Sequence, residues 1–254
     1  VQGTFDDCQA LVKAAMADPA LSTEHRFSSA NSINIGRLLP QAIYYADASL
    51  RHLARTGRQA SFVVPTGNLG NALAAFIARL AGLPIDEIVI ATNANRTIVD
   101  YLDSAEWLPR ESVQTHASAM DVGNPSNMER MRTLFGDADA LRALTRAVAV
   151  ADASIEDEIR RTYNDAGVIV CPHTATAIHV WREMPDRQRR DKDWILVATA
   201  HPAKFETIVE PLIGAEIPLP PELERILSLP SRFQRMAPDL SALSDCLRNG
   251  YNAS

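Results

Sequence analysis

Residues 62–71 read F-V-V-P-T-G-N-L-G-N, and the helical pattern A-L-A-A-F-I-A-R-L follows at 72–80. The aromatic and β-branched run that opens this stretch is typical of a buried strand, which Pro65 ends because proline has no amide hydrogen for a central ladder. A glycine-bearing turn between a strand and a helix suits phosphate, since the backbone can approach closely and the helix N-terminus presents free N–H groups. The stretch therefore predicts a phosphate site, to which Asn68 and Asn71 can each add an amide donor.

A simpler interpretation of the same stretch stays open at this point. Gly67 and Gly70 can serve only a tight turn, with Asn71 as the N-cap of the helix. Two glycines do not make the three-glycine dinucleotide fingerprint, and no Gly-Lys-Ser/Thr follows as in nucleoside-triphosphate loops. The local pattern alone does not decide between a turn and a phosphate site.

The whole chain has 254 residues, 46% hydrophobic and 22% charged, which predicts one large or two smaller globular domains. A net charge of −6 gives no support for nucleic acid or an anionic membrane as a partner. Cys8, Cys171 and Cys246 are far apart without metal spacing, so we expect a reducing compartment, the cytoplasm, and no metal site. There is no transmembrane run or secretory segment in the sequence.

Strand and helix patterns alternate along the chain. A second apolar run at 87–92 follows the first helix, so 61–92 reads as a β-α-β unit, which requires a parallel sheet. We expect further strands at 168–171 and 194–199, and helices between 128 and 164. The sequence therefore predicts an α/β fold with a mostly parallel sheet flanked by helices.

Three polar loops follow the predicted strands, at 66–71, 172–174 and 199–204. In sheets of this kind, ligands bind at the carboxyl ends of the strands. Because three separate loops point to one crevice, the phosphate interpretation is favoured over the simple turn.

Five motifs in order resemble those of one enzyme family. They are S-A-N-S-I-N-I-G-R-L-L-P-Q at 29–41, V-P-T-G-N-L-G-N at 64–71, A-T-N-A-N-R-T at 91–97, S-A-M-D-V-G-N-P-S-N at 118–127 and T-A-H-P-A-K-F at 199–205. Together they are similar to the bacterial and fungal threonine synthases, across nearly the whole chain. These are lyases of threonine biosynthesis that use pyridoxal 5′-phosphate to convert O-phosphohomoserine and water into threonine and phosphate. The resemblance implies the fold type II architecture of tryptophan synthase β.

The resemblance also implies roles for individual residues. The cofactor phosphate would be held by the loop that comprises Gly67, Asn68, Leu69, Gly70 and Asn71. The Thr199 hydroxyl would lie near the pyridine nitrogen and, being neutral, would leave that nitrogen largely unprotonated. The substrate phosphate would be held by Ser32, Asn34 and Arg37, the last with a bidentate grip. The alternatives are that Ser32 and Asn34 are caps, that Arg37 is a solvated charge and that Thr199 only follows a strand.

The family's Schiff-base lysine lies in a phenylalanine-lysine-aspartate motif that we expect upstream of these residues. Lys204 matches the A-H-P-A-K-F motif, which is not that position. We therefore expect no catalytic residue within residues 1–254, and an inactive chain when it is isolated. We also expect 1–30 to be the tail of the small domain, 31–254 to be the C-terminal part of the large cofactor-binding domain, and the fold to be incomplete at its N-terminus. Val1 in place of methionine agrees with a piece of a longer protein.

Two other functions are compatible with the residues. A related pyridoxal-phosphate lyase, such as a dehydratase, is disfavoured by N-S-I-N-I-G-R at 31–37, since those enzymes hold no substrate phosphate. A truncated homologue that binds a phosphorylated ligand or a protein partner agrees with the expected position of the lysine. Binding of pyridoxal phosphate separates this second alternative from the enzymes.

Overall fold

The computed structural model describes residues 1–231 and 233–249. Its contacts group Val1–Ser29 with the residues from Pro218 onward as unit 1, and Ala30–Ile217 as unit 2. Unit 1 contains α1 (Phe5–Ala17), α2 (Pro19–His25), α12 (Pro221–Leu227) and α13 (Leu240–Arg248). The two units are a property of this structure, and the division into small-domain and large-domain residues at 30 stays a prediction.

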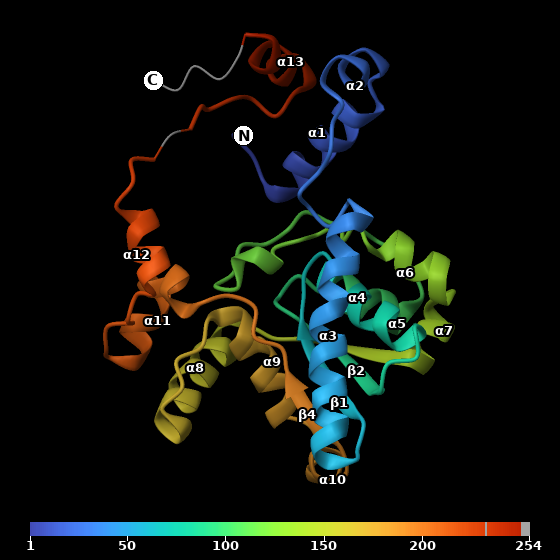
Figure 1. The fold of residues 1–254 in the computed structure, drawn as a ribbon, viewed down its shortest axis with the longest axis vertical. Coiled ribbons are helices and arrows are strands. Elements are labelled where there is room, and N and C mark those ends of the chain that lie inside the picture. Colours follow the sequence, from blue (N-terminus) through green and yellow to red (C-terminus); the bar gives the residue numbers. More distant parts are fainter. Residues whose placement is uncertain (232, 250–254) are drawn as a thin grey trace. The chain divides into compact units, whose positions relative to one another are not determined.

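Unit 2 is built on a sheet of four parallel strands (Figure 1). The strands are β1 (Ala60–Pro65), β2 (Ile85–Thr92), β3 (Thr145–Ala149) and β4 (Asp193–Leu196), in the order β3-β2-β1-β4. The parallel β-α-β unit that the sequence predicts at 61–92 is confirmed, with β1 and β2 joined through α4 (Gly70–Leu80).

Two of the expected elements differ from the structure. The β-branched run at 168–171 is not a strand but a connection into α9 (Pro172–Arg182), because β2 and β4 already occupy both edges of β1. Residues 145–149, which fall in the stretch expected to be helical, form β3 and pair with β2. The fourth expected strand is shorter than predicted and ends at Leu196, although the Val197 N–H still donates to the Val63 carbonyl at 3.0 Å.

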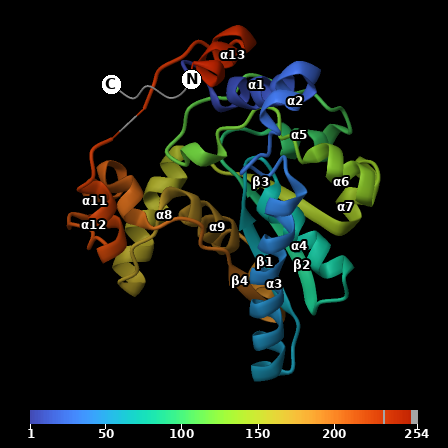
Figure 2. The same ribbon diagram turned by 45° about the horizontal axis from the view of Figure 1, so that its top comes forward.

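Helices cover both faces of this sheet. One face packs against α4, with α3 (Ile35–Thr56) alongside, and the other packs against α9, with α8 (Asp152–Ala166) alongside (Figures 1 and 2). The remaining helical segments of unit 2 are α5 (Thr97–Ser104), η1 (Ser118–Met120), α6 (Met128–Phe135), α7 (Ala138–Leu144), α10 (Asp186–Asp191), η2 (Pro202–Phe205) and α11 (Glu206–Ile213).

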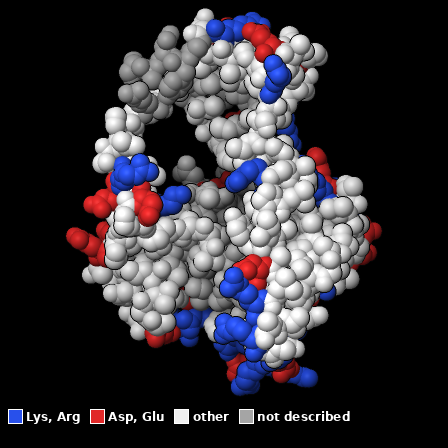
Figure 3. Space-filling model, viewed as in Figure 1, with Lys and Arg blue, Asp and Glu red and all other residues white. Residues whose placement is uncertain are grey.

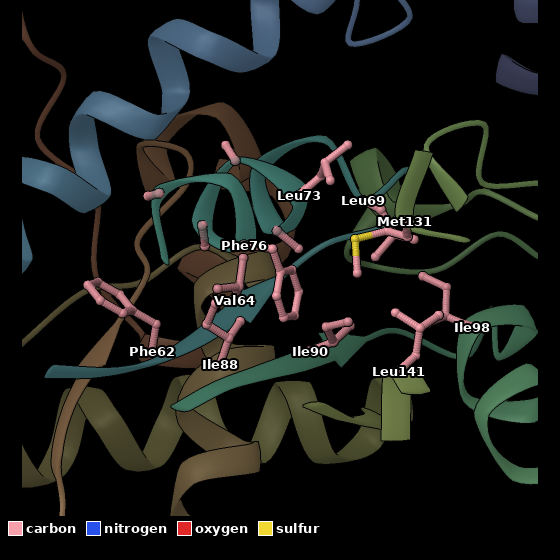
Figure 4. Close-up of a cluster of buried hydrophobic side chains, with 14 of the residues drawn as sticks. Phe62, Val64, Leu69, Leu73, Phe76, Ile88, Ile90, Ile98, Met131 and Leu141 are labelled. Atoms are coloured by element: carbon pink, nitrogen blue, oxygen red, sulfur yellow. The ribbon is translucent and has the colours of Figure 1, made fainter. Parts of the chain in front are cut away.

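The core lies between the sheet and α4. Alternate residues of β1 and β2, namely Phe62, Val64, Ile88 and Ile90, point toward Leu73 and Phe76 of α4 (Figure 4). This period of two follows from the pleat of a strand, and all these side chains are almost fully buried. The rigid layer fixes the position of the loop between β1 and α4.

The charged side chains of unit 2 form no single-sign surface on the face drawn in Figure 3, where basic and acidic residues are intermixed. Among the described residues, no helix has the length and apolar character that crossing a membrane requires.

Candidate functional site

The loop from Thr66 to Leu69 leaves the carboxyl end of β1 and leads into α4. Leu69 is the N-cap of α4, with a φ of 61° and a side chain that is fully buried in the core. Asn71 is therefore not the N-cap, and that alternative is wrong. The first turn of α4 has no side-chain cap and no acidic residue. Its positive end is thus available to an external anion.

The backbone amides of this loop have no partner inside the protein. The flanking N–H groups are paired, since Thr66 donates to the Ala91 carbonyl at 2.9 Å and Leu73 donates to the Leu69 carbonyl at 2.8 Å. Between them, the amides of residues 67–71 donate no hydrogen bond to any residue that the structure describes. Five consecutive amides at a helix N-terminus form a cradle for a phosphate group.

The two glycines of the loop are required by close contacts within the protein. A Cβ on Gly67 would lie 2.6 Å from Met120 Cα and 2.8 Å from the Met120 oxygen, and a Cβ on Gly70 would lie 2.7 Å from Ser32 Cβ. Both distances are shorter than real Cβ contacts. The glycines therefore let two distant segments, around Ser32 and Met120, close around the loop.

A polar cluster of Ser32, Asn68 and Asn127 fixes the loop from outside. The Asn68 amide donates to Ser32 Oγ at 3.1 Å, and the Asn127 amide donates to Ser32 Oγ at 3.0 Å and to the Asn68 carbonyl at 2.9 Å. The Asn71 amide donates to the Pro65 carbonyl at 2.9 Å. Because both side-chain amides that we expected to act as phosphate donors have protein partners, the backbone N–H groups are left as the anion ligands.

Replacing Asn127 with alanine is expected to lower the free energy of unfolding by about 1–3 kcal/mol, because three polar partners lose a bond in a buried place. Asn127 is fully buried, and its Oδ1 also accepts from Arg130 at 2.6 Å. The measurement is chemical denaturation of the full-length protein. The matched control is Asn164→Ala on the exposed side of α8, which should change stability by less than about 0.5 kcal/mol. Equal midpoints for the two variants would show that the cluster does not hold the loop.

A cleft of about 480 Å³ lies beside the loop in unit 2 and is lined by three of the predicted residues, Arg37, Asn71 and Thr199. The rest of its wall comes from α3, Phe62 and residues 195–198. Arg37 is exposed and has no ion-pair partner among the described residues. Its guanidinium is therefore available to an anionic ligand.

The other predicted substrate residues are not part of the cleft wall. Ser32 belongs to the polar cluster at the loop, and Asn34 is the N-cap of α3, where its side chain accepts from the Gly36 N–H at 2.9 Å. Capping is thus a demonstrated role for Asn34. Substrate contact by Ser32, Asn34 and Arg37 stays a prediction.

Thr199 is held against the N-terminus of α9. Its N–H donates to Thr174 Oγ1 at 3.4 Å, and its hydroxyl lies 3.9 Å from Cys171 Sγ. The sequence places Cys171 and Thr174 on a different loop, 28 and 25 residues away. Sequence reasoning did not assign either residue to the site, and the convergence of the loops after the strands was the only available signal.

The loop that contains Met120 is fixed by a buried amide and a carboxylate. The Asn93 amide donates to Asp121 Oδ1 at 2.7 Å, and the Thr115 hydroxyl donates to the same oxygen at 2.7 Å. Burial raises the pKa of Asp121, against the lowering effect of the bonds from Thr115 and Asn93. Sequence reasoning flagged this long polar stretch as functional or flexible but missed the contacts of Met120 and Asn127 with the phosphate loop.

Two family profiles match the chain. The family described as "Pyridoxal-phosphate dependent enzyme" matches residues 1–200, and "Threonine synthase, C-terminal" matches residues 174–247. The threonine synthase of Serratia marcescens is 39% identical over 231 residues, which cover 91% of this chain and 53% of that protein. The threonine synthase of Escherichia coli K12 is 35% identical over 253 residues, which cover 98% of this chain and 57% of that protein. The chain thus spans little more than half the length of these relatives.

Solved structures agree with the sequence matches. The crystal structure of E. coli threonine synthase superposes with a TM-score of 0.89 at 34% identity, covering 98% of this chain and 57% of that one. The pyridoxal-phosphate-bound threonine synthase of Brucella melitensis gives a TM-score of 0.82 at 30% identity, covering 99% of this chain and 59% of that one.

Proposed function

This chain belongs to the family of pyridoxal-phosphate-dependent enzymes, and from that premise we propose that the full-length protein is a threonine synthase. Its reaction converts O-phosphohomoserine and water into threonine and phosphate, with pyridoxal 5′-phosphate as cofactor. The observation on which this proposal depends most is the loop at residues 67–71, whose five free amides precede an uncapped helix. The order of the five threonine-synthase-like motifs supports the substrate.

The residues of the loop fit the phosphate of the cofactor. Amides that have no internal partner leave a need for external acceptors, and the dipole of an eleven-residue helix favours a dianion at this end. Side chains do not obstruct the approach, because Leu69 turns inward to the core and positions 67 and 70 have no side chain. We propose Gly67, Asn68, Leu69, Gly70 and Asn71 as the phosphate ligands, through their backbone.

Two residues of the cleft serve the rest of the reaction. When bound, pyridoxal phosphate supplies an electron sink for bond cleavage at the substrate's carbon atoms. Arg37 orients the substrate by its phosphate, through the planar donor fork that phosphate accepts. Thr199 meets the pyridine nitrogen of the cofactor with its hydroxyl. We place the enzyme in the cytoplasm, because all three cysteines of the described chain are free.

The test is an assay of the full-length protein with pyridoxal phosphate, in which phosphate released from O-phosphohomoserine and threonine formed are measured together. Equal amounts of the two products are expected. Ammonia released from serine or threonine, with O-phosphohomoserine untouched, would instead show a dehydratase. Binding of the cofactor without turnover of either substrate class would contradict both activities.

A further inference from the structure

Cys171 occupies an unusual position beside Thr199. It is fully buried and is the N-cap of α9, where its sulfur accepts from the Thr174 N–H at 3.5 Å. The Thr174 hydroxyl is 3.3 Å from the sulfur and the Thr199 hydroxyl is 3.9 Å from it. Because Thr174 Oγ1 already accepts the Thr199 N–H, its own proton can point to the sulfur. The sulfur is therefore surrounded by donors at the positive end of an eleven-residue helix.

His173 adds a further donor. Its Nε2 accepts the Ala119 N–H at 3.0 Å, so the proton of the neutral ring is on Nδ1. That Nδ1 is buried and has no hydrogen-bond partner of ordinary geometry among the described residues. The ring is 97% buried, since only 3% of His173 is exposed. The Nδ1–H group of this ring is directed to the Cys171 sulfur closely enough to influence its ionisation.

The charged groups on the elements packed against α9 have partners of their own. β1 has no charged residue. On α8, β2 and β4 the acidic residues all form ion pairs, which are Asp152 and Glu156 with His116, Asp157 with Arg160, Glu158 and Asp165 with Arg182, Asp86 and Glu87 with Lys192, and Asp193 with His52 and Arg58. Among titratable side chains, His173 alone contributes to the ionisation of Cys171.

The donors outweigh burial at this sulfur. Burial raises the pKa of Cys171, but His173, the hydroxyl and amide of Thr174 and the Ala200 amide together bring it down to about 6. A thiol with this pKa is mostly thiolate at neutral pH, whereas an ordinary cysteine with a pKa of about 8.5 is mostly protonated.

We propose that Cys171 is a positioning residue, which as a thiolate accepts the Thr199 hydroxyl proton in a hydrogen bond and so turns the Thr199 oxygen toward the cleft as an acceptor. The proton that Cys171 loses goes to the solvent, and no bond is formed or broken. The consequence for the cofactor depends on the proposed function. An acceptor at Thr199 holds the pyridine nitrogen in its N–H form, which is the opposite of what a neutral threonine alone implies.

The thiolate is tested first and without cofactor. The ultraviolet thiolate absorbance of the full-length protein is followed against pH, and the curve of Cys171→Ser is subtracted. The difference should show one transition with a midpoint at about pH 6. His173→Phe should move that midpoint upward by about one pH unit or more, since a donor is lost. The matched control Cys246→Ser, in unit 1, should leave the transition in place. A midpoint near 8.5, the ordinary value for cysteine, would overturn the proposal.

The second measurement reads the pyridine nitrogen. The protein is loaded with ring-¹⁵N-labelled pyridoxal phosphate, and the nitrogen shift is recorded at pH 8. The wild type should show the protonated nitrogen, and Cys171→Ser and Cys171→Ala should both show the unprotonated one. An unchanged shift in both variants would overturn the proposal, even with a thiolate present. Failure of the wild type to bind cofactor would sink the proposed function instead, and the first titration identifies that case.

Discussion

Replacing Gly67 with alanine is expected to weaken binding of pyridoxal phosphate to the full-length protein by about tenfold to 100-fold, which corresponds to the roughly 1–3 kcal/mol cost of overpacking. The new methyl group would meet three backbone atoms of Met120, its Cα, C and O, at 2.6–2.9 Å. Backbone atoms cannot rotate away as a side chain can. The loop must therefore move, and the amides of residues 67–71 lose their alignment.

The matched control for this substitution is Gly57→Ala. Gly57 ends α3 with a φ of 71°, and a Cβ there meets nothing within 4 Å. This change should cost about 1 kcal/mol of stability through backbone strain and leave cofactor affinity unaltered. Affinity is measured by titration with pyridoxal phosphate, and stability by denaturation. If both variants bind the cofactor as the wild type does, the position of the loop does not matter for binding.

Arg37→Lys is expected to raise the KM for O-phosphohomoserine by about tenfold to 100-fold and to leave cofactor affinity within about twofold, because lysine cannot form the bidentate fork. Arg37 lines the cleft and has no ion pair within the described chain, so the change disturbs no internal bond. Steady-state kinetics and a cofactor titration on the same preparation measure the two effects.

Arg51→Lys is the control for Arg37, since Arg51 lies on the same helix and is paired on the surface with Asp47 at 2.7 Å. It should alter neither quantity. If Arg37→Lys reduces cofactor and substrate binding equally, Arg37 has a structural role and the substrate phosphate lies elsewhere.

The parts of the fold that sequence predicted well are those fixed by local chemistry. The strand, turn and helix at residues 60–80 follow from a β-branched run, a proline, two glycines and an apolar helical pattern. The strand at Thr145–Ala149 could not be predicted in this way, because T-R-A-V-A adjoins a helical pattern and becomes a strand only by pairing with β2. The apolar run at 168–171 shows the converse, since no edge of the neighbouring strand is free for it.

The candidate site was predictable only in part for a related reason. The phosphate loop is a contiguous stretch, and its residues could be named from the sequence. The contact of Gly67 with Met120, the cluster of Asn127 with Ser32, and the approach of Thr199 to Cys171 join segments that are between 28 and 95 residues apart. Such contacts depend on how the loops meet at the end of the sheet, and no local pattern encodes them.

The central claim is that the free amides of residues 67–71 bind the cofactor through its phosphate. The most direct test is the ratio of the dissociation constants of pyridoxal and pyridoxal phosphate, measured for the full-length protein and for Gly70→Ala. The wild type should bind the phosphorylated form at least about 100-fold more tightly, as several charge-assisted hydrogen bonds imply, and the variant should lose most of that preference. Equal affinity of the wild type for the two compounds, or an unchanged ratio in Gly70→Ala, would contradict the account.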